Sequence, residues 1–340
     1  MTITIKDLAE LAQVSMGTVS RVINDGPGVG EETRKRILKL VKELDYQPNA
    51  SAHGLAAKRS GNIGLIIPHT SSYSMSTAYW PNLLTAIIEQ AAAKNYNVLL
   101  STSRSEEDVD SAYKSILKGR RIDGLIIGSE QFGDKQLAEL LLKDFPFVMV
   151  GQSMSISHYY VDVDSAGGAQ RMTEHLLALG HRQIAMLAGP EHYPSVISRV
   201  SGFQRAMAEA GLDPSRVFHC PYWTRRATEI SREIIRGPEG VTAIFAAAGD
   251  LVTGVLQAVR AEKLRIPADL ALAAFDDHPL YEYFSPAITA VSQPTGLLGE
   301  AAAKQLFQLM EGKIPAAKGE ILPTALIIRE SCGGRPGSAG

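Results

Sequence analysis

Four side chains near the amino terminus have the types and spacing of groups that contact nucleic acid. Ser15, Thr18, Ser20 and Arg21 fall on the exposed face of one short predicted helix. Short hydroxyls and a guanidinium donate to phosphate oxygens and to base edges, whereas a merely solvated helix face usually carries Glu and Lys. The pattern favours a DNA-binding helix, and the alternative is an ordinary hairpin of two helices.

A second set of polar side chains follows the apolar runs of the remaining chain, where parallel strands would end. Ligands of open α/β sheets bind beyond the carboxyl ends of the strands. Carboxylates there, together with a guanidinium and an aromatic ring, would suit the vicinal hydroxyls and the C–H face of a polyol. The residues at these positions are His69, Ser129, Gln152, Asp250 and Asp276.

Enzymatic chemistry has no recognisable motif in this chain. No Walker sequence, GxSxG elbow, HExxH pair or dinucleotide glycine fingerprint stands in a strand–helix context. Cys220 and Cys332 lie far apart and outside any metal-ligand spacing. We therefore expect no catalytic residue, no metal and no cofactor, and an enzyme or an exported sugar-binding protein is a distant alternative.

The donor side chains require a small helical head. Thr4 and Asp7 form the pattern of a capping box, which predicts a first helix over 5–12. Ser15 is a good N-cap for a second helix that runs to Ile23, and an amphipathic third helix is expected over 31–44. Two short helices joined this closely are typical of a helix-turn-helix.

The polar residues at strand ends require an α/β body. From residue 61, apolar runs alternate with amphipathic segments, and runs that are apolar on both faces predict parallel strands covered by helices on each side. Two series of runs predict two doubly wound lobes. Helices are expected near 166–179, 198–210, 224–235 and 250–262.

Composition is that of a multi-domain globular protein. The 340 residues are 45% hydrophobic and carry a net charge of −2, which argues against bulk electrostatic coating of nucleic acid. Residues 1–60 hold nine Lys or Arg against seven Asp or Glu, so the small positive excess belongs to the head. The start lacks the pattern of a signal peptide, and we expect a cytoplasmic protein without membrane contact.

The segments IKDLAELAQVSMGTVSRVIND and TRKRILKLVKELDYQPNASAHGLA closely resemble the head of the lactose-repressor (LacI/GalR) family. The resemblance continues to about Glu330 through HLLALGHRQIAMLAGP, SRVSGF, AAFDDH and SQPTGLLGE, which stand in family order. It implies a sequence-specific repressor of sugar-utilisation genes, controlled allosterically by a small carbohydrate. A purine or another non-sugar effector is the alternative.

The resemblance also implies a fold. It combines an all-α helix-turn-helix head with an α/β body of two lobes, similar to a type I periplasmic binding protein. We expect the head at 1–48, a hinge at 49–60, the body at 61–330 and a flexible tail at 331–340. Crossings between the lobes are expected near Asp162, Val291 and Glu320, so that the first lobe holds about 61–161 and 292–319 and the second about 162–291 and 320–330.

Carried over residue by residue, the resemblance implies a DNA-binding surface. Leu55 matches a leucine that the family inserts between base pairs, although simple hinge packing would also explain it. We expect the hinge, which contains Gly54, to be disordered without DNA. The DNA-binding set is Thr4, Ser15, Met16, Gly17, Thr18, Ser20, Arg21, Asn24, Thr33, Tyr46, Asn49 and Leu55.

The effector site is implied in the same way. Asp276, Arg199 and Trp223 match the family's ligand aspartate, its cleft arginine and a stacking aromatic residue, and a structural salt bridge is the alternative for Arg199. Four rings add weaker candidates, because an aromatic residue after a loop also serves lobe packing. These four are Tyr79, Trp80, His192 and Tyr193.

Some positions depart from the family pattern. Met16-Gly17 replaces larger polar readers, so the operator sequence does not transfer, and Gln13 occupies a turn where positive φ is often required. Gly249-Asp250 stands for the usual Asn-Asp pair, and Gly151 stands for an aspartate.

Assembly follows from symmetry. Two heads on a near-palindromic operator require a homodimer, and the tail SCGGRPGSAG has no leucine repeat to make a tetramer. Ligand between the lobes would change the spacing of the hinges. Whether it releases or tightens DNA is not encoded in a visible motif.

Overall fold

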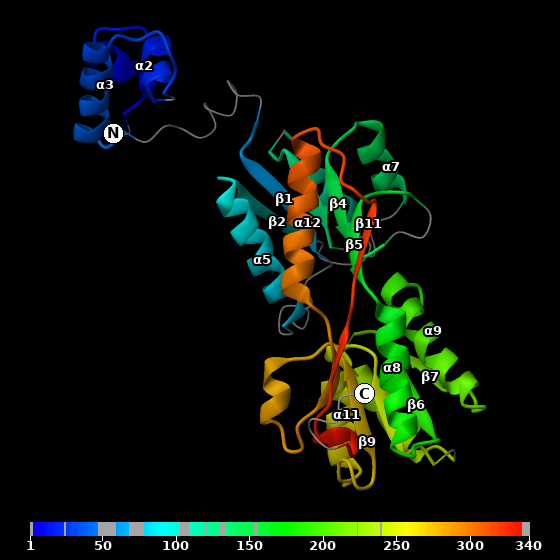
Figure 1. Cartoon of the computed structure of the whole chain (residues 1–340). Coiled ribbons are helices and arrows are strands. Elements are labelled where there is room, and N and C mark those ends of the chain that lie inside the picture. Colours follow the sequence, from blue (N-terminus) through cyan, green and yellow to red (C-terminus); the bar gives the residue numbers. More distant parts are fainter. Residues whose placement is uncertain are drawn as a thin grey trace. The chain divides into compact units, whose positions relative to one another are not determined.

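The protein is described here from a computed structural model that covers residues 3–23, 25–46, 59–67, 78–102, 109–119, 121–128, 134–152, 156–222, 224–238 and 240–334. For 109–112, 134 and 224 it describes the backbone alone. The chain divides into two compact units, 1–60 and 61–340 (Figure 1).

The first unit is a bundle of three helices. They are α1 (Ile5–Leu11), α2 (Met16–Ile23) and α3 (Glu31–Glu43), within a residue of the predicted bounds. Thr4 and Asp7 form the predicted capping box at the start of α1. Leu8, Val19 and Ile37, one from each helix, are completely buried and form the small core. Local caps and one shared apolar face therefore define the head.

The second unit holds two six-stranded sheets. In the first sheet the order is β11-β5-β4-β3-β1-β2, and every pair of neighbours is parallel. Its strands are β1 (Asn62–Ile67), β2 (Asn97–Thr102), β3 (Gly124–Ile127), β4 (Phe147–Val150), β5 (Tyr160–Val163) and β11 (Gly319–Leu322).

The second sheet has the order β12-β10-β9-β8-β6-β7. Only β12 runs antiparallel to its neighbour, because the chain leaves the second lobe after β10 and re-enters it through β12. Its strands are β6 (Ile184–Ala188), β7 (Val217–His219), β8 (Ala243–Ala246), β9 (Ala271–Phe275), β10 (Thr289–Ser292) and β12 (Ala325–Ile327). The two doubly wound lobes are confirmed.

Helices cover both faces of each sheet. In the first lobe, α5 (Tyr79–Ala93) and α12 (Thr295–Met310) pack on one face, with α6 (Val109–Leu117) and α7 (Asp134–Leu142) on the other. The second lobe pairs α8 (Ser165–Ala178) with α9 (Pro194–Glu209), and α10 (Thr224–Arg236) with α11 (Gly249–Ala261). Gly202 lets α9 approach α8, because a Cβ there would lie 2.0 Å from the Ala166 carbonyl oxygen.

The chain passes between the lobes at residue 164, at 293–294 and at 323–324, as the ribbons in Figure 1 show. These crossings fall two to four residues after the expected positions. Residues 320–322, expected in the second lobe, belong to the first, because β11 pairs with β5 along its whole length. Likewise, Ser292 ends β10 of the second lobe.

The flexible tail expected at 331–340 was predicted to begin too early in the chain. Residues 330–332 form a short 3-10 helix, η3 (Glu330–Cys332), in which Ser331 and Cys332 are completely buried. The Ser331 hydroxyl donates to the Leu272 carbonyl oxygen at 2.6 Å, so this segment is part of the second lobe. Residues 335–340 lie outside the described part. None of the described helices has the length and apolar character needed to span a membrane.

Candidate functional sites

The predicted recognition helix α2 carries an exposed Met16 at its start. The hydroxyl of Ser15 accepts a hydrogen bond from the Thr18 amide at 3.1 Å, and lies 2.9 Å from the Thr18 hydroxyl. Ser15 is thus the N-cap that the sequence indicates. Arg21 is exposed, and Ser20 is half-buried.

The remaining DNA-binding candidates fall into three groups. Thr4 is engaged in the capping box, which accounts for it without DNA. Thr33 is half-buried near the start of α3, and Tyr46 packs against the head core. The others, Asn24, Asn49 and Leu55, lie outside the described residues, as does the hinge segment with Gly54, so their roles remain predictions.

Arg34 is a residue of the head that sequence reasoning missed. Its guanidinium donates to the Asp25 carboxylate and to the Gly26 carbonyl oxygen, both at 2.6 Å. These bonds tie the loop after α2 to the first turn of α3. The signal was present in the sequence as an arginine four residues into a helix that follows a glycine-rich loop.

Gln13 adopts a left-handed backbone with φ of +52°, as its turn position suggested. Replacement by glycine is expected to stabilise the head by about 0.5 to 1 kcal/mol, because glycine has no Cβ to strain there. The head contains no tryptophan. Amide hydrogen exchange at Leu8 and Val19 in the full chain is the suitable measurement, and exchange should slow severalfold. Gln13→Ala is the matched control: it retains the Cβ, and equal slowing in it would contradict the strain argument.

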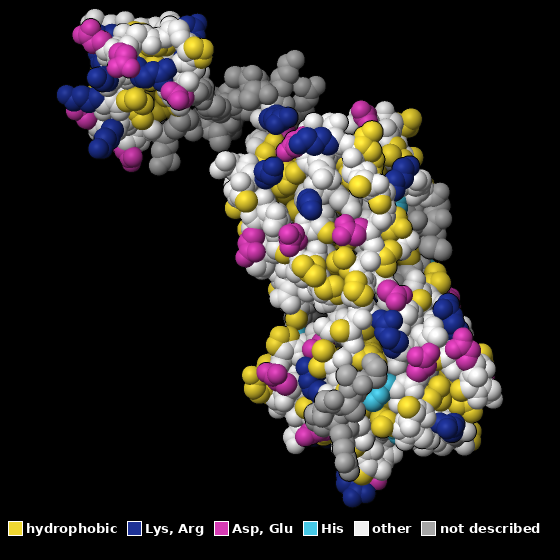
Figure 2. Space-filling model, viewed as in Figure 1, with side chains coloured by type: hydrophobic (Ala, Val, Ile, Leu, Met, Phe, Trp, Pro, Cys, Tyr) yellow, Lys and Arg dark blue, Asp and Glu magenta, His cyan; other side chains and the backbone are white. Residues whose placement is uncertain are grey.

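Charge on the head is mixed. Figure 2 shows basic and acidic side chains interspersed on its visible face, without one continuous basic field. Binding to DNA by such a surface depends on fit and base contacts more than on net charge.

Asp276 is the centre of the candidate effector site. It follows strand β9 directly and has a left-handed backbone with φ of +73°. Its carboxylate accepts hydrogen bonds from the side-chain amide of Gln293 and from the backbone amide of Gly249, the latter at 3.3 Å. Gln293 lies at the crossing between β10 and α12, so its bond joins Asp276 of the second lobe to the segment that leads into the first lobe's helix.

Arg199 is the buried cation of the site. It is 7% exposed, on α9, and its guanidinium lies 3.5 Å from the Asp276 carboxylate. It also donates to the Ala247 carbonyl oxygen at 2.7 Å and lies 3.9 Å above the Phe275 ring centre. The salt bridge considered as an alternative role exists, and its partner is the candidate ligand aspartate.

Two further carboxylates lie near this pair. Asp250 is in the first turn of α11, where burial, reinforced by the Asp276 charge, raises its pKa to about 6. Asp162, in β5, accepts from the Gln152 amide at 3.1 Å, and burial raises its pKa while the Arg199 charge opposes the shift. Burial of Tyr281, together with the charges of Asp276, Asp277 and Asp250, raises its pKa.

The structure thus brings together Arg199, Asp250 and Asp276, and links Gln152 to the same region through Asp162. Sequence reasoning missed Asp162 and Gln293. The rule that located Asp276, a polar residue after a parallel strand, also points to Gln293 after β10. It does not point to Asp162, which lies within a strand.

The aromatic candidates that the structure describes contact one another in pairs. Tyr193 is 8% exposed, and its ring lies 4.5 Å from the exposed His192 and 6.1 Å from Tyr222. Tyr79 and Trp80 begin α5, with ring centres 5.1 Å apart. A Cβ on Gly128 would lie 2.6 Å from the Trp80 ring, so Trp80 covers the residue after β3. His69, Ser129 and Trp223 lie outside the described residues.

Helix α11 begins at the pair Gly249-Asp250, which stands where the resemblance has Asn-Asp. Ala248 is its N-cap and provides no side-chain bond, and Gly249 is its first residue. Asp250 is therefore inside the helix and offers its carboxylate from the first turn, close to Asp276.

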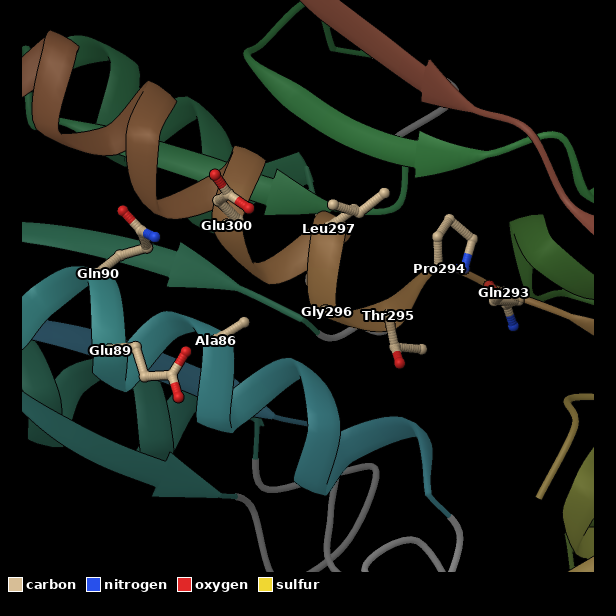
Figure 3. Close-up of a pocket in the computed structure, with 9 residues that line it drawn as sticks. All are labelled: Ala86, Glu89, Gln90, Gln293, Pro294, Thr295, Gly296, Leu297 and Glu300. Carbon is tan, nitrogen blue, oxygen red and sulfur yellow. The ribbon is translucent and has the colours of Figure 1, made fainter. Parts of the chain in front are cut away.

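A surface groove of about 480 Å³ lies between α5 and α12. Figure 3 shows Glu89 and Gln90 on α5 opposite Glu300 on α12, while Gln293 points away from them. Among the described residues that line this groove, Gln293 is the one bonded to Asp276. The groove residues are Ala86, Glu89, Gln90, Gln293, Pro294, Thr295, Gly296, Leu297 and Glu300.

Both units match known protein families. Residues 4–49 match bacterial regulatory proteins of the lacI family, and residues 173–332 match a periplasmic binding protein-like domain. The HTH-type transcriptional regulator CelR of Thermobifida fusca is 30% identical over 335 residues, covering 96% of this chain and 98% of that protein. The HTH-type transcriptional repressor PurR of Escherichia coli O139:H28 is 30% identical over 315 residues, covering 91% of each.

Solved structures agree. The lac repressor dimer bound to operator and the anti-inducer ONPF superposes with a TM-score of 0.86 at 26% identity, covering 98% of this chain and 99% of that one. The transcriptional regulator CelR–cellobiose complex gives 0.74 at 28% identity, covering 97% and 99%. The chain belongs to the LacI family of transcriptional regulators, with a helix-turn-helix head and a periplasmic-binding-protein-like body.

Proposed function

We propose that this chain is a cytoplasmic, DNA-binding repressor of sugar-utilisation genes, controlled by a small carbohydrate bound at the Arg199–Asp276 cluster. The observation that carries the proposal is the buried Arg199–Asp276 pair, which lies at the carboxyl edge of the second sheet and is bonded to Gln293. A carboxylate, a guanidinium and an amide offer the donors and acceptors that vicinal hydroxyls require.

The described candidates for DNA contact are Ser15, Met16, Gly17, Thr18, Ser20, Arg21, Thr33 and Tyr46. We propose a homodimer that places two such heads on a near-palindromic operator, since a symmetric protein matches a symmetric site. Exposed apolar side chains on the second lobe support self-association: Tyr283 is 76% and Leu280 55% exposed. Sedimentation at micromolar concentration should give a dimer, and a tetramer would contradict this assembly.

The alternative is a purine effector, which the similarity to PurR supports. Differential scanning fluorimetry with sugars and with hypoxanthine separates the two, since bound ligand raises stability by RT ln(1 + [L]/Kd). We expect a rise in melting temperature with a sugar. A rise with hypoxanthine and none with any sugar would refute the carbohydrate proposal.

The sign of regulation comes from repeating the titration with operator DNA selected from random sequence. Linkage is reciprocal: if the effector weakens operator binding, the operator complex binds the effector more weakly by the same free energy. This coupling free energy is typically about 1 to 3 kcal/mol. Equal effector affinity with and without operator would contradict allosteric control.

A further inference from the structure

The described ionisable side chains around Arg199 are predominantly acidic. Asp162, Asp250 and Asp276 are the carboxylates, and Arg199 is the one described cation in contact with the group. The adjacent Asp277 is already neutralised, because Arg329 donates to both of its oxygens, at 2.7 Å and 3.1 Å. The cluster therefore has an excess of negative charge.

Asp250 differs from the other two carboxylates in its contacts. Asp276 accepts from Gln293 and Gly249, and Asp162 accepts from Gln152 and from the Val163 amide. Within the described part of the chain, the Asp250 carboxylate makes no hydrogen bond or ion pair, although the residue is half-buried and directly follows Gly249, whose amide donates to the Asp276 carboxylate at 3.3 Å. An acceptor in that position is available to a donor on the ligand.

The described residues offer no further compensating charge. Within that part of the chain, no lysine or arginine other than Arg199 contacts Asp250 or Asp276. A ligand anion near Asp250 and Asp276 would meet one guanidinium that Asp276 already engages. At separations of a few ångströms and a partly screened dielectric, one uncompensated repulsion changes affinity by about two orders of magnitude.

We propose that the effector is a polyhydroxylated compound without negative charge, neutral or amino-substituted, and that Asp250 is the residue that excludes its anionic forms. This inference rests on the proposed carbohydrate-controlled function. In the proposed complex, Asp276, Arg199 and Gln293 bind the hydroxyls of the effector. Asp250 accepts a hydrogen bond from one further hydroxyl or ammonium group, and its charge repels a phosphate or carboxylate.

The test is a thermal-shift and calorimetry panel of matched compounds at pH 7.5. Each of glucose, galactose and mannose is compared with its 2-amino, 6-phosphate and uronate forms, and cellobiose with cellobionate; hypoxanthine is included. For the sugar that binds, we expect binding of its neutral or amino form. Its phosphate or uronate should bind at least about 100-fold more weakly. An anion that binds more tightly than its neutral parent would overturn the charge inference and leave the carbohydrate proposal standing. Binding of hypoxanthine alone would refute the carbohydrate proposal itself.

Asp250→Asn tests the residue, since it retains the size and one acceptor but removes the charge. The affinity gap between the neutral sugar and its anion should narrow about 100-fold in this variant, because the variant lacks that one repulsion. Asp213→Asn is the matched control, because it removes one carboxylate from an exposed loop of the same lobe whose contacts are Ser215 and Arg216. An unchanged gap in Asp250→Asn, or an equal narrowing in the control, would overturn the role of Asp250.

Discussion

Arg199→Met is expected to abolish effector-induced stabilisation and to lower the stability of the body by about 3 kcal/mol, which corresponds to a fall of about 6 to 12 °C in melting temperature. Arg199 is 7% exposed, and methionine fills its volume without its charge. The change leaves the Asp276 carboxylate and the Ala247 carbonyl oxygen without their guanidinium partner. Removal of one member of a buried ion pair is costly because the remaining charge is still desolvated.

Thermal unfolding followed by circular dichroism, with and without the effector found in the panel, measures both effects. Arg265→Met is the matched control: its pair with Asp269 is a surface pair, with the Arg265 side chain 76% exposed, and its loss should cost no more than about 1 kcal/mol. A double-mutant cycle with Asp276→Asn should give a coupling energy well above that of the surface pair. Wild-type stability in Arg199→Met, with a retained effector shift, would contradict the assignment.

Local features of the head were predictable from the sequence, because short-range chemistry determines them. The Thr4–Asp7 capping box, the Ser15 N-cap and the left-handed Gln13 each depend on neighbours within four residues. Their residue types therefore identify the helix ends to within a residue. Operator preference is not local in this sense, because it depends on base contacts that Met16 and Gly17 leave unspecified.

The effector cluster was predictable only in part. The rule that ligands lie after parallel strands identified Asp250 and Asp276 without knowledge of the sheet order. Asp162 escaped because it lies within strand β5 and not after it, and its partner Gln152 comes from the preceding loop. The long-range pairing of β11 with β5 moved 320–322 into the first lobe. Tyr193 shows the converse case, a plausible ligand ring that tertiary packing buries.

The second large effect concerns Asp250 in the protein without ligand. Asp250→Asn is expected to stabilise the free protein at pH 7.5 by about 1 to 3 kcal/mol, or about 2 to 12 °C in melting temperature. The cause is its pKa of about 6 in the folded state, which burial and the Asp276 charge raise above the ordinary value of 3.8. Ionisation of this carboxylate is therefore less favourable in the folded protein than in the unfolded chain.

The sign of the pH dependence follows from proton binding. Between about pH 4 and pH 6, the folded protein holds a proton on Asp250 that the unfolded chain has released, so stability falls as pH rises through this window. Above about pH 6 the penalty is complete. The variant lacks this penalty. Its stability should therefore equal that of wild type near pH 4 and exceed it by the full amount at pH 7.5. Asp162, whose pKa is also raised, contributes equally to both proteins and cancels from the difference.

Melting temperatures of wild type, Asp250→Asn and the exposed-loop control Asp213→Asn at pH 4.5, 6 and 7.5 test this directly. The pKa of Asp213 is lowered by hydrogen bonds from Ser215, so its substitution should have no stabilising effect at pH 7.5. An advantage for Asp250→Asn that is the same at all three pH values would show that the ionised carboxylate carries no penalty. A stabilised variant that discriminates poorly between neutral and anionic sugars would instead show why the wild-type protein retains this carboxylate: the free energy lost in the empty site provides selectivity in the occupied one.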